Sequence, residues 1–217
     1  MIVLGLDTAV GACSVAVLAR GEALAVRSEP MLRGHQERLA PMVREVMAEA
    51  GLAFAALDRI GVTVGPGSFT GLRVGLSFAK GLGLALALPV VGVGTLEALA
   101  ASEPGADMTL AVIDARRGQV YLQAFSQGRA LMAPDALILG MAAARLVELR
   151  PSGRIDIVGP GAALLDGVIP GARIIPRAAP DPVVLAGLAQ SKPLTPARPL
   201  YLRAPDAKLP GGLDPPA

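Results

Sequence analysis

The succession of apolar patterns in the first half of the chain limits its fold more than any other feature. Segments 2–8, 13–20 and 23–28 are rich in branched apolar residues and are separated by short glycine-containing turns, as strands of hairpins are. Beyond them, helical patterns alternate with short apolar runs at 59–64 and 90–93. Hairpins followed by such an alternation predict an α/β fold, in which a mixed sheet carries helices on its faces.

Three helices are expected between and after these strands. An apolar stripe at helical spacing predicts a helix that ends near Gly51 and accommodates Pro41 in its first turn. The members of the stripe are Leu39, Met42, Val43, Val46, Met47 and Ala50. A second helix is expected over 70–88, where a proline ends it, and a short third helix over 95–102, capped by Thr95.

The tripeptide Glu103-Pro104-Gly105 is the expected boundary between two domains. The prediction is a first domain over 1–103, a second domain over 104–200, and a disordered proline-rich tail over 203–217. In the second domain, strands are expected at 108–114, 119–125, 129–132 and 155–158, and helices at 140–150 and 181–190.

Composition argues against several classes of protein. The formal net charge is +2 with scattered charges, and aromatic residues make up 3% of the chain, so neither a basic stripe nor a base-stacking platform is indicated. The longest uncharged run of the helical region, Gly81 to Leu96, is interrupted by Pro89 and is shorter than the roughly 20 residues of a membrane span. A single cysteine allows no intrachain disulfide and fits a reducing compartment. We therefore expect a cytoplasmic protein that covers part of its apolar surface in an interface.

A glycine-rich turn, VGPGSFTGLR at 64–73, follows a predicted strand and opens a predicted helix. Helix N-terminal amides can bind a phosphate. The turn lacks the lysine and hydroxyl of a P-loop, because Leu72 and Arg73 follow Gly71, and its glycine spacing departs from the dinucleotide fingerprint. We favour a structural turn over a phosphate cradle.

The helix behind this turn carries a small residue at every fourth position. The row consists of Gly71, Gly75, Ala79, Gly83 and Ala87. Small residues in a row let another backbone approach closely, and each glycine costs up to about 1 kcal/mol relative to alanine unless packing offsets it. A helix buried on its own sheet would explain the row. We favour a helix with one face on the sheet and another on a partner helix.

Few other residues suggest chemistry. Cys13 lies in an apolar run and is expected to be a buried thiol. His35 has no second histidine or cysteine beside it, so we expect a surface or helix-start residue rather than a metal ligand. Asp7 could orient a metal or phosphate, or cap a turn. The segment 114–117 fits an ion-paired corner or a domain contact equally well.

Several motifs taken together resemble the TsaB family, also called YeaZ. They are VLGLDT, CSVAVL, GHxExLxPM, GPGSFTGLRVGLSFAKGL, PVVGV, VIDARRGQVY and, near the end, PLYLR. The resemblance is strong over 1–125. It implies the actin-like ATPase (ribonuclease H-like) fold, an α/β architecture of two related halves, each a mixed sheet flanked by helices.

The resemblance also implies a function. Members of the family serve in the threonylcarbamoyladenosine modification of tRNA as non-catalytic subunits that bind the transferase TsaD, which the ATPase TsaE joins. For this chain it implies no catalytic residue, no cofactor and no metal, and only indirect contact with tRNA. Exposed apolar helices further predict a homodimer when the chain is free.

The resemblance further implies which residues matter. The expected partner-binding residues are Leu39, Met42, Val43, Val46, Gly71, Leu72, Arg73, Gly75, Leu76, Ala79, Lys80 and Gly83. A vestigial nucleotide or phosphate loop is expected at Asp7, Thr8, Gly65, Gly67 and Ser68.

Two enzymatic alternatives stay open: a small-molecule kinase of the same fold and a metallo-glycoprotease. The catalytic relatives carry two metal-binding histidines at the positions of Thr95 and Leu99, and neither of these side chains can replace imidazole. The relatives' later nucleotide loop contains an asparagine that 159–162 lacks. Both differences argue against the enzymatic alternatives.

Overall fold

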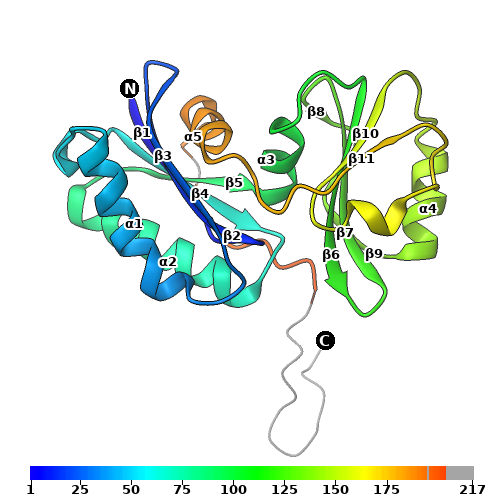
Figure 1. Ribbon diagram of the computed structural model, residues 1–217, viewed down its shortest axis with the longest axis horizontal. Coiled ribbons are helices and arrows are strands. Elements are labelled where there is room, and N and C mark those ends of the chain that lie inside the picture. Colours follow the sequence, from blue (N-terminus) through cyan, green and yellow to red (C-terminus); the bar gives the residue numbers. More distant parts are fainter. Residues whose placement is uncertain (195, 204–217) are drawn as a thin grey trace, which may run out of the picture.

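The computed structural model describes residues 1–194 and 196–203, and these form two mixed sheets, one in each half of the chain, with helices on both faces (Figure 1). The tail predicted over 203–217 lies, apart from Arg203, outside the described residues. No helix within the described ranges is long and apolar enough to cross a membrane.

The first sheet has five strands in the order β3-β2-β1-β4-β5. The first three strands pair antiparallel and the last two join them in parallel, as hairpins followed by helical crossovers require. The strands are β1 (Ile2–Asp7), β2 (Ala12–Ala19), β3 (Glu22–Pro30), β4 (Arg59–Gly65) and β5 (Val90–Gly94). The helical elements of this half are α1 (His35–Glu49), η1 (Phe54–Ala56), α2 (Phe69–Leu86) and α3 (Thr95–Ala101).

The second sheet has the order β11-β10-β6-β7-β8, and β9 also pairs with β7. Its strands are β6 (Met108–Arg116), β7 (Gln119–Ser126), β8 (Arg129–Ala130), β9 (Asp135–Ile138), β10 (Ile155–Val158) and β11 (Arg173–Ile175). The helical elements are α4 (Leu139–Glu148), η2 (Ala162–Leu165) and α5 (Pro182–Ser191). The fold class predicted from the sequence is therefore confirmed.

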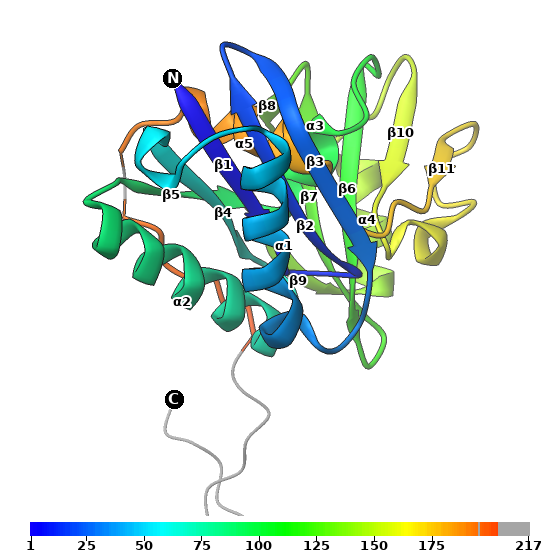
Figure 2. The same ribbon diagram turned by 60° about the vertical axis from the view of Figure 1, so that its left-hand side comes forward.

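Helices α1 and α2 lie together on one face of the first sheet (Figure 2). The apolar stripe of α1 points into the core beneath it, and so do the first four members of the small-residue row of α2, Gly71, Gly75, Ala79 and Gly83; the fifth, Ala87, is exposed beyond the end of the helix. Burial of such a stripe provides most of the stability of a helix in a protein.

The last helix of each half packs on the sheet of the other half. Helix α5 covers the second face of the first sheet, where a Cβ on Gly5 would lie 2.9 Å from the carbonyl oxygen of Pro182, and one on Gly61 would collide with Ala189. Helix α3 packs on the second sheet through Leu96 and Leu99. This exchange joins the two halves, and it places 182–191 on the first sheet although the sequence prediction put that segment in the second domain.

Two local predictions about the helices are wrong. Pro41 lies in the second turn of α1 rather than the first, because the helix begins at His35, and burial of the stripe offsets the missing backbone hydrogen bond. Thr95 does not cap α3: Gly94 occupies the cap position, and the hydroxyl of buried Thr95 has no partner among the described residues.

The short strands of the second half were the least predictable. The strand expected over 129–132 is only the two-residue β8. Strands β9 and β11 were not predicted, since four and three residues are too short to display an alternation. Pairing with their neighbours makes them strands.

Candidate functional site

Asp7 stands at the carboxyl end of β1 and is fully buried. Its Oδ1 accepts hydrogen bonds from the Ala9 amide at 3.0 Å and the Thr63 hydroxyl at 2.7 Å. Its Oδ2 is buried without a partner among the described residues. Burial raises the pKa of Asp7 to about 6, although these hydrogen bonds act in the opposite direction. Asp7 is therefore a destabilising buried carboxyl group at the carboxyl end of the central strand of the first sheet.

The loop beside Asp7 fills the space in front of α2. The Ser68 amide donates to the Ala9 carbonyl at 2.7 Å, the Gly71 amide donates to the Ser68 hydroxyl at 3.2 Å, and the Thr8 hydroxyl donates to the Gly71 carbonyl at 2.7 Å. A Cβ on Gly71 would collide with the Thr8 carbonyl oxygen. The glycines thus let two backbone segments touch, which supports a structural turn rather than a phosphate cradle.

Gly65 and Gly67 belong to the same packed turn. Gly65 has φ +111°, and a Cβ there would lie 2.7 Å from the Leu200 carbonyl oxygen. A Cβ on Gly67 would collide with the Ala9 carbonyl oxygen. The five residues predicted as a vestigial nucleotide loop are thus brought together, and their contacts are with the chain's own backbone.

The second half repeats this arrangement. Asp114 lies two residues before the end of β6, and its Oδ1 accepts from the amide two residues on, that of Arg116, at 2.7 Å, as Asp7 accepts from the Ala9 amide. The sequence VGPG occurs at 64–67 and again at 158–161. This repeated tetrapeptide is a signal of the internal duplication that the sequence analysis missed. The ion pair of Arg116 with Asp114 at 3.2 Å supports the ion-paired corner predicted for 114–117.

Most of the residues predicted to bind a partner are buried inside this chain. A Cβ on Gly75 would lie 2.5 Å from the Thr8 hydroxyl oxygen, and one on Gly83 would collide with Val90. These positions therefore face the chain's own sheet, and the prediction that they bind a partner stays a prediction. The buried residues of the predicted set are Leu39, Met42, Val43, Val46, Gly71, Leu72, Gly75, Leu76, Ala79 and Gly83.

The outer face of α2 carries a second row of small residues. Ser77, Gly81 and Ala85 are exposed at four-residue intervals, and nothing lies within 4 Å of a Cβ built on Gly81. Beside them, Leu84 exposes 87% of its surface. Of the predicted partner residues, Arg73 and Lys80 are exposed on this side of the helix. We call Ser77, Lys80, Gly81, Leu84 and Ala85 the outer α2 face.

The other residues considered in the sequence analysis are Cys13, His35, Thr95 and Leu99. Cys13 is fully buried in β2, as predicted, and burial raises the pKa of its thiol to about 11, so the reactive thiolate is disfavoured. His35 is the first residue of α1, as expected, but it is buried. Thr95 and Leu99 are both fully buried. Across 1–194 and 196–203, no group of three His, Cys, Asp or Glu side chains is placed to hold a metal ion.

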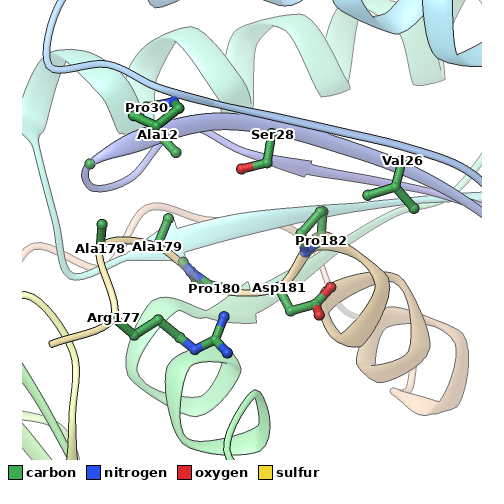
Figure 3. Close-up of a pocket in the computed structure, with 11 residues that line it drawn as sticks. Ala12, Val26, Ser28, Pro30, Arg177, Ala178, Ala179, Pro180, Asp181 and Pro182 are labelled. Atoms are coloured by element: carbon green, nitrogen blue, oxygen red, sulfur yellow. The ribbon is translucent and has the colours of Figure 1, made fainter. Parts of the chain in front are cut away.

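A groove of about 390 Å³ separates β3 from the segment that leads into α5 (Figure 3). Its two charged lining residues are already engaged. Arg177 donates to Glu103 at 2.9 Å, and Asp181 caps α5 by accepting from the Val183 amide at 2.8 Å. The groove therefore offers mainly an apolar, open surface.

The two sheets, their exchanged terminal helices and the paired aspartate turns define the chain as a protein of the actin-like ATPase fold class. The activator of 2-hydroxyisocaproyl-CoA dehydratase from Clostridium difficile shares this fold with a TM-score of 0.51 at 14% identity, covering 87% of this chain and 94% of that chain.

Comparisons with known proteins define the family more narrowly. A family model described as TsaD, tRNA N6-adenosine threonylcarbamoyltransferase, matches residues 27–151. YeaZ from Pseudomonas aeruginosa superposes with a TM-score of 0.77 at 32% identity, covering 93% of this chain and 99% of that chain. The chain belongs to the TsaB/YeaZ family.

Two relatives at the sequence level agree with this assignment. An uncharacterized protein of Mycobacterium tuberculosis is 38% identical over 210 residues, 95% of this chain and 93% of that protein. The tRNA threonylcarbamoyladenosine biosynthesis protein TsaB of Escherichia coli is 41% identical over 124 residues, 56% of this chain and 53% of the E. coli protein. The similarity to named TsaB proteins is thus concentrated in about half of each chain.

Proposed function

We propose that this chain is a non-catalytic subunit in the biosynthesis of threonylcarbamoyladenosine in tRNA, and that it docks the transferase TsaD through the outer α2 face. Relatives that carry the TsaB name support the role in this biosynthesis. The closed loop at Asp7, Thr8 and Gly71 supports the non-catalytic character, since the Thr8 hydroxyl donates to the Gly71 carbonyl and a Cβ on Gly71 would collide with the Thr8 carbonyl oxygen, so these residues form no open phosphate cradle. The ATPase TsaE then joins the pair.

One observation supports the outer α2 face as the docking surface: no described neighbour within the chain requires a glycine at Gly81. Gly71, Gly75 and Gly83 are each required by a close neighbour within the chain, whereas a side chain at Gly81 would meet open space. A glycine in a helix interior costs about 1 kcal/mol relative to alanine. Close approach of a second helix offsets that cost, and Leu84 beside Gly81 supplies apolar surface for it.

The same face suits self-association in the absence of the transferase. A homodimer through α2 would cover Leu84 in both copies by a two-fold contact. The homodimer and the complex with TsaD would then use the same surface, so TsaD competes with the second copy of this chain. The homodimer is expected to dissociate as TsaD is added.

The test is Gly81→Leu. The side chain points into open space, so the variant folds, but it blocks the approach of a second helix. We expect the affinity for TsaD to fall at least about tenfold by calorimetry. Modified adenosine in tRNA should fall with it in a reconstitution that contains TsaD, TsaE, the donor synthase, ATP, bicarbonate, threonine and tRNA.

Gly140→Leu is the matched control. Gly140 is also an exposed helical glycine with open space around it, but it lies on α4 in the second half. Normal TsaD binding by Gly81→Leu would remove the outer α2 face from the proposal. Failure of the wild-type chain to bind TsaD, or modification that proceeds equally without it, would refute the proposed function.

A further inference from the structure

The exposed side of α2 carries positive charge and no negative charge. The helix contains Arg73 and Lys80 and no acidic residue. Both cations are exposed, and neither forms an ion pair within the described part of the chain. Since seven residues separate them, they lie on the same side of the helix, about 10 Å apart along its axis. The apolar side chain of Leu84 is exposed on this same side.

The neighbouring helix α1 does not neutralise these two cations (Figure 2). On its outer side, exposed Glu37 and Arg44 carry opposite charges. Its remaining charged residues form ion pairs with β3, at the edge of the sheet that lies away from α2. The members of this network are Arg27, Glu29, Arg38, Glu45 and Glu49. The positive charge on α2 is therefore available to a partner.

Aromatic rings hold the guanidinium of Arg73 in place. It lies over the ring of Phe69, 3.7 Å from the centroid, and the ring of Tyr201 packs against Phe69 at 5.3 Å between centroids. A guanidinium that stacks through its face keeps its edge N–H groups available for hydrogen bonds. Because the side chain is already ordered, a carboxylate that binds it causes less loss of rotamer freedom. Phe69 is thus a positioning residue for Arg73.

We infer that the outer α2 face and Arg73 bind an acidic surface of the transferase, and that their charge disfavours a second copy of this chain. The inference rests on the proposed function and deepens it, because it states the chemistry of the surface that TsaD presents. That surface carries carboxylates opposite Arg73 and Lys80, about two helical turns apart, and an apolar residue opposite Leu84.

A second copy of this chain presents the same positive charge to the face. In a two-fold contact, the residues beside the axis meet their own counterparts in the other copy. Close approach at Gly81 places the two Lys80 ammonium groups beside that axis, since Lys80 directly precedes Gly81. Like charges within a screening length, about 10 Å at 0.1 M salt, repel each other. Salt should therefore strengthen the homodimer and weaken the complex with TsaD.

The experiment measures both associations of the full chain at about 0.01 M and about 1 M salt, where the screening length is about 30 Å and about 3 Å. Sedimentation equilibrium gives the homodimer constant, and surface plasmon resonance gives the association and dissociation rates with TsaD. For the wild type we expect the higher salt to tighten the homodimer and to slow association with TsaD by about tenfold.

Three variants separate the contributions. Lys80→Gln should tighten the homodimer by about threefold at low salt and slow association with TsaD, and both salt dependences should shrink. Arg73→Gln should slow association with TsaD but leave the homodimer almost unchanged, because Arg73 is two helical turns from the axis. Phe69→Leu keeps both charges, so it should speed dissociation from TsaD without changing the salt dependence of association.

Arg129→Gln is the matched control. Arg129 is exposed on β8 in the second half and forms no ion pair with any residue that the structure describes. The substitution removes the same charge as Lys80→Gln and should leave both associations like those of the wild type.

Three results would overturn the inference: association with TsaD that is independent of salt, equal effects of Arg129→Gln and Lys80→Gln, or no gain in self-association for Lys80→Gln at low salt. If the wild type binds TsaD equally at both salt concentrations and Gly81→Leu loses that binding, the proposed function stands and only the inference about charge fails. A wild type that binds TsaD at neither salt concentration would refute the proposed function itself.

Discussion

The two halves of this chain share one topology but differ in what covers their sheets. The order β3-β2-β1-β4-β5 recurs as β9-β7-β6-β10-β11, and the first strand of each half carries an aspartate that accepts from the amide two residues on, while a VGPG sequence stands at the end of β4 and of β10. Where the first half has α2, of 18 residues, the second half has only η2, of four. A long helix at this place in the fold is therefore a property of the first half.

The buried carboxylates show a second difference. Asp7 has no cation against it, and burial raises its pKa. Asp156 in β10 is also fully buried; burial alone would raise its pKa, but the hydrogen bonds from Arg173 and Arg154 outweigh this and lower it. A buried carboxylate without a neighbouring cation destabilises the fold, whereas one that is hydrogen-bonded to a cation can stabilise it.

The equivalence of the two VGPG turns is tested by Gly67→Ala and Gly161→Ala. The new methyl group would collide with the Ala9 carbonyl oxygen in the first half, and would lie 2.7 Å from the Asp114 amide nitrogen in the second. Because backbone atoms cannot move aside cheaply, each variant should lose about 3 kcal/mol of unfolding free energy in urea titrations. Gly140→Ala, in open space, is the control. Tolerance of alanine at Gly161 alone would mean that the second turn yields and the halves are not equivalent there.

The cost of burying Asp7 is tested by Asp7→Asn. The pKa of Asp7 is about 6 when folded, against 3.8 in the reference state, so the stability linked to this group is complete below pH 4 and is lost as the pH rises through 6. The variant should therefore be more stable than the wild type by about 2 kcal/mol at pH 8, with the difference shrinking toward pH 4. A pH series of urea titrations measures this. An equal difference at both pH values would assign the effect to packing instead of charge.

The support of Asp156 is tested by Arg173→Ala. The guanidinium donates to both carboxylate oxygens, at 3.0 and 2.7 Å, and its loss leaves a buried charge with only the longer contact to Arg154 at 3.5 Å. We expect a loss of about 1–2 kcal/mol at pH 7, reduced because Arg173 is half exposed. Since the pKa of Asp156 is lowered in the fold, the loss should shrink as the pH falls below the unfolded value.

The control for this experiment is Arg145→Ala, which removes an exposed pair with Glu148. Its effect should stay within about 0.5 kcal/mol. A similar effect of the two variants would show that burial of Asp156 has no energetic consequence.

The smallest effect concerns the two rows of α2. Gly81→Ala should raise the unfolding free energy by about 0.5–1 kcal/mol, because it removes the helical cost of glycine without a steric penalty. Gly83→Ala, two residues away, should lower it, because the methyl group would collide with Val90. Thermal denaturation of both variants distinguishes them. Stabilisation at Gly83 would contradict the orientation of α2 on its sheet.

Local sequence patterns predicted the elements of the first half because each signal there is strong. The stripe from Leu39 to Ala50 and the strands at 59–64 and 90–93 match α1, β4 and β5 within a few residues. The short strands β9 and β11 escaped prediction, since pairing with β7 and β10, and not their own residues, makes them strands.

For the candidate site, the sequence showed that α2 carries closely spaced glycines. It could not show which of them face the chain's own sheet and which face outward. Periodicity gives the angle between side chains around a helix, and only packing fixes that angle relative to the sheet. Tertiary structure thus assigned Gly71, Gly75 and Gly83 to the core and left Gly81 exposed. It also brought the ring centroids of Phe69 and Tyr201 to within 5.3 Å of each other, because contacts between distant segments are a property of the folded chain and of no single stretch of it.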